Sequence, residues 1–188
     1  MARPRSDEKR NAILAAAIRI IATQGLSAPT AAIAREAGVS NGALFTYFDT
    51  KSDLLNHLYL HLKAGMAAAT TTGLPLDADL RGQMRHVWDR WVAWAMAHPD
   101  QRRALAYLAV SHDVTPATHD AASQLYAGIA ALLERSREHG ALRAAPLMFV
   151  GALVMGVLDA TVNYMTLDAA NAPAHADAGF DALWRILA

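Results

Sequence analysis

The residues whose types and spacing suggest a specific chemistry lie between Ala34 and Lys51, in the stretch AREAGVSNGALFTYFDTK. Helix-forming residues are followed by a break at Gly38, which can adopt the left-handed backbone, and then by a helix barely two turns long. The sequence predicts this second helix over residues 41–48, with Ser40 as its cap. Leu44 and Phe48 lie four residues apart within it, so we expect both on one buried face.

The opposite face of the short helix carries small, polar and aromatic side chains. They are Asn41, Gly42, Ala43, Phe45, Thr46 and Tyr47. A helix that is held by one apolar seam and offers a slim, weakly charged face can enter the major groove of DNA. The pattern therefore predicts a helix-turn-helix whose second helix reads base edges.

The sequence TAAIAREAGVSNGALFTYFDTKSDLL, residues 30–55, resembles the DNA-binding signature of the TetR family of transcriptional repressors. The shared features are an opening threonine, Ile-Ala, Ala-Gly-Val-Ser, a second glycine, aromatic residues and a lysine soon after them. The resemblance covers about residues 13–55, and beyond them it is limited to length and an all-helical plan. It implies an N-terminal three-helix DNA-binding domain, a C-terminal ligand-binding domain and a homodimer built on the last two helices.

The resemblance also implies roles for individual residues. Phosphate contacts fall on Thr30, Ser40, Tyr47 and Lys51, and close approach to bases falls on Gly42, Ala43 and Thr46. Two positions depart from the family pattern. Phe45 stands where the family often has tyrosine, so a phenolic phosphate contact is lost. Asn41 stands where a basic residue is frequent, and its carboxamide could read a base edge instead.

Composition and periodicity predict an all-α protein, because alanine is abundant and no segment has the pattern of a strand. We expect about nine helices, at residues 6–23, 30–37, 41–48, 52–69, 77–98, 99–111, 115–139, 145–167 and 178–187. Ser6 and Thr30 are the predicted caps of the first two helices, and Gly25 and Gly140 are predicted left-handed ends. The first helix carries its apolar residues at helical spacing on one face, at Ile13, Leu14, Ala17, Ile20 and Ile21. Residues 1–51 are predicted to form the helix-turn-helix domain, and residues 52–188 the helical ligand-binding and dimerisation domain.

Three tryptophans, Trp88, Trp91 and Trp94, share one face of the predicted helix at 77–98. The same spacing occurs on any buried helix face, so these side chains can form core, line a pocket, or do both. Asp159 and Asn163 lie four residues apart in an apolar helix and must face either a polar pocket or solvent. The candidate ligand-binding residues are therefore Trp88, Trp91, Trp94, Tyr107, Asp159 and Asn163.

Small residues recur every four positions at Ala152, Gly156 and Ala160 and permit close helix packing. This strip is a candidate dimer seam, together with Trp184 and Leu187 on the last helix. Packing within one chain would explain the strip nearly as well.

Other classes of site have little support. There is no cysteine, and no glycine-rich phosphate loop or nucleophile motif, so we expect no catalytic residues and no cofactor. His57 and His61, or His112 with Asp113, lack a third ligand, and we expect no metal site. A basic arm, Arg3, Arg5, Lys9 and Arg10, could touch DNA or remain a solvated end.

The charged N-terminus lacks a secretory signal, and the most apolar stretch stops at Asp159, short of the roughly 20 residues that span a bilayer. We therefore expect a cytoplasmic protein. The function predicted is a ligand-responsive regulator that binds a near-palindromic operator as a homodimer and is released by a small, largely apolar effector. The alternative is a helical interaction or small-molecule-binding protein without a role in gene regulation.

Overall fold

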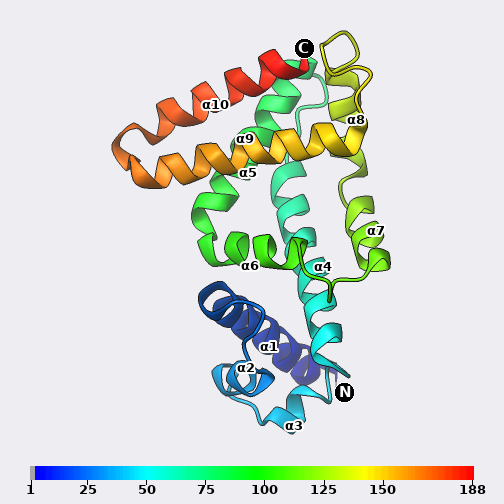
Figure 1. Cartoon of the computed structure of the whole chain (residues 1–188), viewed down its shortest axis with the longest axis vertical. Helices are drawn as coiled ribbons and strands as arrows, with labels where there is room; N and C mark the ends of the chain where they lie inside the picture. The colour runs from blue at the N-terminus through cyan, green and yellow to red at the C-terminus, as the bar shows by residue number, and fades with distance from the viewer. Residues whose placement is uncertain (1–2) are drawn as a thin grey trace. The chain divides into compact units, whose positions relative to one another are not determined.

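The computed structural model describes residues 3–188, which form ten α-helices and one short 3-10 helix and contain no strand (Figure 1). The helices are α1 (Arg3–Gln24), α2 (Thr30–Glu36), α3 (Asn41–Leu44), α4 (Lys51–Thr71), α5 (Leu80–Ala97), α6 (Pro99–Ala109), α7 (Pro116–Gln124), α8 (Ala127–Ser136), α9 (Leu147–Leu167) and α10 (Ala172–Leu187), and the 3-10 helix η1 (Ala169–Asn171) precedes α10. The predicted all-α fold is confirmed.

The chain divides into two compact units. The first contains the residues up to Gly65 together with His98–Gln124, and the second contains Met66–Ala97 and Leu125–Ala188. The first unit therefore combines the helices of the predicted DNA-binding domain with α6 and α7. Helix α4 contributes its first fifteen residues, 51–65, to one unit and its remaining residues to the other.

The core of the first unit is built on the apolar face of α1. The predicted face is buried throughout, at Ile13, Leu14, Ala17, Ile20 and Ile21. Helix α1 packs against α2 and against α6. Helix α6 begins at Pro99, as predicted, because proline suits a position whose backbone N–H has no partner in any case.

The second unit is centred on α5 and on the adjacent pair α9 and α10, drawn in orange and red in Figure 1. Trp88 of α5 donates from Nε1 to the backbone oxygen of Ala176 at 3.0 Å, and its ring meets Phe180 edge to face at 6.1 Å. A Cβ atom at Gly179 would collide with Thr161 Oγ1 and would lie 2.8 Å from Trp88 Cζ2. The absence of a side chain at Gly179 therefore permits this crossing of α9 and α10.

Several helix predictions were wrong in extent. The helix predicted at 115–139 is two helices, α7 and α8, separated by a turn at Leu125–Tyr126 on the boundary of the two units. The last helix begins at Ala172 and not at Ala178, because Pro173 is accommodated in its first turn. Helix α1 begins at Arg3 and not at Ser6, whose side chain lies outside the described residues.

Gly25 and Gly38 have the predicted left-handed backbone, with φ of 73° and 69°. The same prediction was wrong for Gly140, because φ is positive only at Gly25, Gly38 and Gly73 among the described residues, and α8 already ends at Ser136. A Cβ atom at Gly140 would instead collide with the backbone oxygen of Leu187. Gly140 is required by this close approach of the α8–α9 loop to the end of α10.

Helix α9 is longer than the apolar stretch in the sequence, because it continues through Asp159 to Leu167. In the part of the chain that the structure describes, it is the one helix long and apolar enough to cross a membrane, judged by length and composition. Only 17% of the most apolar 18-residue stretch of this helix is buried. Its exposed face includes the small strip Ala152, Gly156 and Ala160, whereas Leu187 on α10 is fully buried within the chain. Leu187 therefore cannot belong to an intermolecular seam as predicted.

We predict that Gly179→Ala lowers the free energy of unfolding by about 1–3 kcal/mol, because the added methyl group must displace the stiff Thr161 side chain or the packed ring of Trp88. Chemical denaturation monitored by circular dichroism measures the change. Gly128→Ala is the matched control, since a Cβ atom there meets no atom within 4 Å. Equal stability of the two variants would show that the crossing is not tight.

Candidate nucleic-acid interface

The turn between α2 and α3 is closed by backbone hydrogen bonds around Gly38. Val39 N donates to Ala34 O at 2.9 Å, and Gly38 N donates to Arg35 O at 3.1 Å. The left-handed φ of Gly38 makes this reversal possible, and the buried Ala34 leaves room for the crossing chain. The α2–turn–α3 segment is thus a helix-turn-helix with a short, rigid joint.

Helix α3 is shorter than predicted, since regular helix ends at Leu44 and a turn continues to Tyr47. Its start is capped by Ser40, whose Oγ accepts a hydrogen bond from Ala43 N at 3.1 Å. Leu44 and Phe48 are fully buried, as their spacing predicts. These two side chains hold a helix that is too short to be stable alone.

The opposite side of this segment is open to solvent. Asn41, Gly42, Phe45 and Thr46 are exposed, whereas Ala43 and Tyr47 are half-buried. Phe45 keeps 39% of its surface exposed, although the neighbouring Leu44 has none. The structure therefore brings these six predicted residues together on one short segment, and four of them are exposed.

Of the four residues to which the resemblance gives phosphate contacts, Tyr47 belongs to this segment and Ser40 precedes it as the cap of α3. Thr30 is the first residue of α2 and not its cap, because Pro29 occupies the cap position and the helix has no side-chain cap. Lys51 opens α4, and its Nζ donates to the backbone oxygen of Leu26 at 2.6 Å, which ties α4 to the α1–α2 turn. An ammonium group has three protons, so Lys51 retains donors for a second acceptor.

A polar chain on the first unit positions the turn before α4. Arg10 of α1 contacts His57 Nδ1 through Nη2 at 3.0 Å, and its guanidinium lies 5.3 Å from the centre of the Phe48 ring. His57 Nε2 lies 3.5 Å from Asp53, and Asp53 accepts from Asp49 N at 3.1 Å. Arg10 is therefore engaged with α4 and Phe48 in this structure, and the predicted arm residues Arg3 and Arg5 lie outside the side chains described.

Burial shifts the pKa values of three groups on α4, and it raises the pKa of Tyr59. Desolvation, with a smaller contribution from the charge of Arg10, lowers the pKa of His61. Desolvation also lowers the pKa of Lys63, whose Nζ lies 5.6 Å from the centre of the Tyr59 ring. In residues 3–188 no group of three potential ligands is arranged to hold a metal ion.

Sequence reasoning missed Asn56, which joins α4 to the α6–α7 loop within the first unit. Its Nδ2 donates to Asp113 O at 2.7 Å, and its Oδ1 accepts from Thr115 N at 2.9 Å and from the Thr118 hydroxyl at 2.5 Å. Both ends of the carboxamide are satisfied by residues almost sixty positions away. A single asparagine in a helix gives no sequence signal for such contacts.

Comparison with known proteins agrees with this geometry. Residues 13–58 match the family model described as bacterial regulatory proteins, tetR family. The helix-turn-helix segment thus resembles that of TetR-family regulators. A solved structure of a putative tetR family transcription regulator from Shewanella sp. PV-4 shares 29% sequence identity, with 94% of this chain and 96% of that chain covered and a TM-score of 0.84.

Two more distant TetR-family structures share the fold. A transcription regulator from Marinobacter aquaeolei VT8 has 21% identity over 98% of both chains, with a TM-score of 0.87. The TetR-like regulator LfrR from Mycobacterium smegmatis, solved in complex with proflavine, has 20% identity over 94% of this chain and 95% of that chain, with a TM-score of 0.69.

The three tryptophans of α5 are buried in the second unit, with 2%, 4% and 7% exposed for Trp88, Trp91 and Trp94. The Trp91 and Trp94 rings are tilted, with centres 6.5 Å apart. Trp91 Nε1 is buried, and no acceptor for it is found among the described residues. A buried donor without a partner costs about 1–3 kcal/mol, so this atom is an unusual feature of the core.

The other candidate ligand residues are placed differently. Tyr107 belongs to the first unit and keeps 43% of its surface exposed. Asn163 is exposed on α9, and Asp159 is half-buried there. The exposed Asn163 fits the alternative in which this helix has a solvated side.

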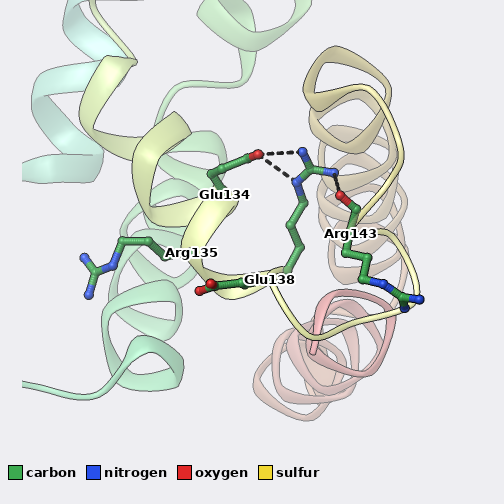
Figure 2. A pocket seen from close by; sticks show the side chains of 5 residues that line it. Glu134, Arg135, Glu138 and Arg143 are labelled. Atoms are coloured by element: carbon green, nitrogen blue, oxygen red, sulfur yellow. Dashed lines mark hydrogen bonds and ion pairs between the residues drawn. The ribbon is translucent and has the colours of Figure 1, made fainter.

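A pocket of about 310 Å³ lies in the second unit, at the α8–α9 loop, and is lined by Glu134, Arg135, Arg137, Glu138 and Arg143 (Figure 2). The buried guanidinium of Arg137 bonds both carboxylate oxygens of Glu134 at 2.8 Å and the backbone oxygens of Leu142 and Ala145 at 2.6 Å. Figure 2 shows Arg135 pointing away from Glu134 and Arg143. The donors of Arg137 are thus used to hold the α8–α9 loop in place. The pocket therefore has a structural role in the packing of this loop.

Proposed function

We propose that this protein is a ligand-responsive transcriptional regulator that acts in the cytoplasm, binds a near-palindromic operator as a homodimer and represses until an effector releases it. The observation that carries the proposal is the exposed surface of α3 and its following turn, held from behind by the buried Leu44 and Phe48. The match of residues 13–58 to the tetR family model and the similarity to solved TetR-family regulators support the same conclusion.

On DNA, the phosphate contacts would come from Thr30, Ser40, Tyr47 and Lys51. The Ser40 hydroxyl accepts the cap hydrogen bond and can still donate its own proton to a phosphate oxygen. Lys51 holds Leu26 O and can donate to a phosphate at the same time. These contacts would fix the position of α3 in the groove without selecting a sequence.

The exposed face of α9 supports a homodimer. Met148, Met155, Tyr164 and Leu167 keep 82%, 36%, 55% and 82% of their surface exposed, and Ile186 on α10 keeps 37%. The strip Ala152, Gly156 and Ala160 is exposed as well, and a Cβ atom at Gly156 would meet no atom within 4 Å. An apolar helix with an uncovered strip of small residues suits close packing against a second copy, and two-fold symmetry would present two α3 surfaces to one operator.

Trp91 supports an effector site in the second unit. Its unpartnered indole N–H lies among buried aromatic rings, and ligand pockets combine such apolar walls with a few polar groups. A largely apolar molecule with one hydrogen-bond acceptor would satisfy this donor. The relative LfrR was solved with proflavine, an aromatic compound, which makes proflavine a suitable first probe.

Helix α4 offers the mechanical connection between effector and DNA. It is continuous from Lys51 to Thr71, so a displacement of its far end moves Lys51 and the turn that follows α3. Asn56 additionally couples α4 to the α6–α7 loop. A coupling free energy of about 1–3 kcal/mol would change operator affinity by about 5- to 150-fold.

We predict that Lys51→Ala weakens binding to operator and to random DNA alike and reduces the slope of log K against log salt by about one, because one phosphate contact is lost. Fluorescence anisotropy at several salt concentrations measures both quantities. Tyr47→Phe should weaken binding without changing the slope. Arg135→Ala, which removes a charge from the second unit, is the control, and an altered sequence preference of Lys51→Ala would contradict the assigned role.

We predict that the purified protein is a dimer and that Gly156→Leu weakens the dimer. The leucine has space within one chain but would separate two closely packed helices. Size-exclusion chromatography with light scattering gives the mass, and Gly128→Leu is the matched control because its Cβ position is also open. A monomer at micromolar concentration would refute the proposed assembly.

We predict that a bound effector quenches tryptophan fluorescence, lowers operator affinity by about 5- to 150-fold and is itself weakened by operator to the same extent, because coupling is reciprocal. Proflavine and a panel of apolar compounds with one acceptor provide the ligands. Trp91→Phe should weaken them, since it removes the donor and keeps the ring, whereas Trp184→Phe should not. A ligand bound at Trp91 that leaves operator affinity unchanged would exclude the coupling.

A further inference from the structure

The surface that α3 and its turn present to solvent has an unusual chemical composition. From Gly38 to Phe48 the chain contains no charged residue and no histidine. Its exposed side chains offer one carboxamide, at Asn41, one aromatic ring, at Phe45, and two hydroxyl groups, at Thr46 and at the helix cap Ser40. Within residues 3–188 the Asn41 side chain makes no hydrogen bond, so both its donor and its acceptor remain available.

These groups differ in which base edges they can satisfy. Guanine shows two acceptors, N7 and O6, in the major groove, and the commonest side chains that bind both are arginine and lysine. Adenine shows an acceptor, N7, beside a donor, the N6 amino group, and a carboxamide matches this pair with two hydrogen bonds. Thymine shows a methyl group, which an apolar side chain contacts favourably.

The basic residues nearby lie outside this segment, and two of them make contacts within the protein. Arg19 forms an ion pair with Glu36 at 2.7 Å, and Lys51 holds the backbone oxygen of Leu26. Arg35 is exposed, but it lies on α2, the helix that crosses the DNA backbone in a helix-turn-helix complex. The segment from Gly38 to Phe48 itself contains no arginine or lysine that could supply the usual contact to guanine.

Threonine and phenylalanine add to the same preference. The hydroxyl of the exposed Thr46 donates to Gly42 O at 3.4 Å, so its proton is used within the protein, and the side chain also carries a methyl group. The ring of Phe45 is exposed, whereas the side chains of Leu44 and Phe48 are buried, so Phe45 is available for contact with a base. Gly42 has no side chain to keep the backbone away from the bases.

We propose that each protomer reads A·T base pairs in the major groove, with Asn41 bonded to N7 and N6 of an adenine and Phe45 against the C5 methyl group of a thymine. The inference rests on the proposed DNA-binding function and specifies the bases that this function selects. The juxtaposition that carries it is a free carboxamide and an exposed ring on a surface without cations.

The test begins with selection of binding sites by the full-length protein from a random DNA pool at fixed salt. A·T pairs should be enriched at the positions that α3 reads in each half-site. Replacing the critical A·T pair by G·C should weaken binding by about 5- to 150-fold, the range for a bidentate base contact. Random DNA at the same salt gives the non-specific reference.

Modified bases then assign each contact to a side chain. Exchange of the adenine for 7-deazaadenine removes one acceptor and should weaken the wild-type protein but have no further effect on Asn41→Ala. Exchange of the thymine for uracil removes only the methyl group and should weaken the wild-type protein but not Phe45→Ala. Gln24→Ala removes an exposed carboxamide from α1 and should respond to both exchanges like the wild type.

The outcomes separate the inference from the function on which it rests. A selected site with G·C pairs at every recognised position would overturn the inference and leave the regulator function intact. The same is true if both modified bases affect the variants as strongly as the wild type. Failure to enrich any sequence from the pool would overturn the proposed function as well. Circular dichroism of Asn41→Ala and Phe45→Ala should match the wild type, since both side chains are exposed.

Discussion

A helix of four residues cannot stabilise itself in water, and the proposed DNA-binding surface depends on how the protein overcomes this. Nucleation of a helix costs more than one turn of hydrogen bonds returns, so α3 must be held by tertiary contacts. Leu44 and Phe48 provide them by complete burial, and the Ser40 hydroxyl satisfies one of the free amides at the helix start. The opposite face is not needed to hold α3 in place, so its exposed side chains are available for recognition.

The same unit uses its cations to position this segment. Arg10 lies against Phe48 and His57, and Lys51 holds Leu26 O. The proposed phosphate contact of Lys51 therefore shares an atom with a structural hydrogen bond, and DNA would bind to a group whose position is already set. Such preorganisation reduces the entropy lost on binding.

The second unit shows two properties that its own packing leaves unexplained. Most of the apolar stretch of α9 is not buried, and the indole N–H of Trp91 is buried without an acceptor. A folded chain usually covers the first kind of surface and pairs the second kind of atom. A second protomer and an effector with one acceptor are the two partners proposed for them, and neither requires a change in the fold of the unit.

Much of the first unit could be predicted from local patterns. The apolar face of α1, the left-handed Gly38, the buried pair Leu44 and Phe48 and the start of α6 at Pro99 were correctly predicted, because each depends on spacing within a few residues. Spacing also predicted the buried tryptophans of α5, although it could not distinguish core from pocket.

Contacts between distant segments decided the rest. The helix predicted at 115–139 is split because its halves pack in different units, and the helix-favouring residues around Leu125 do not reveal this. Gly140 is required by the approach of Leu187 O and not by its own φ, and Asn56 finds its partners almost sixty residues away. The sequence by itself determined which faces of its helices are apolar and where turns are possible, since these are properties of neighbours along the chain. Which apolar faces are covered, and which polar atoms find partners, was decided only by the tertiary structure, because burial depends on residues that the chain brings together from far apart.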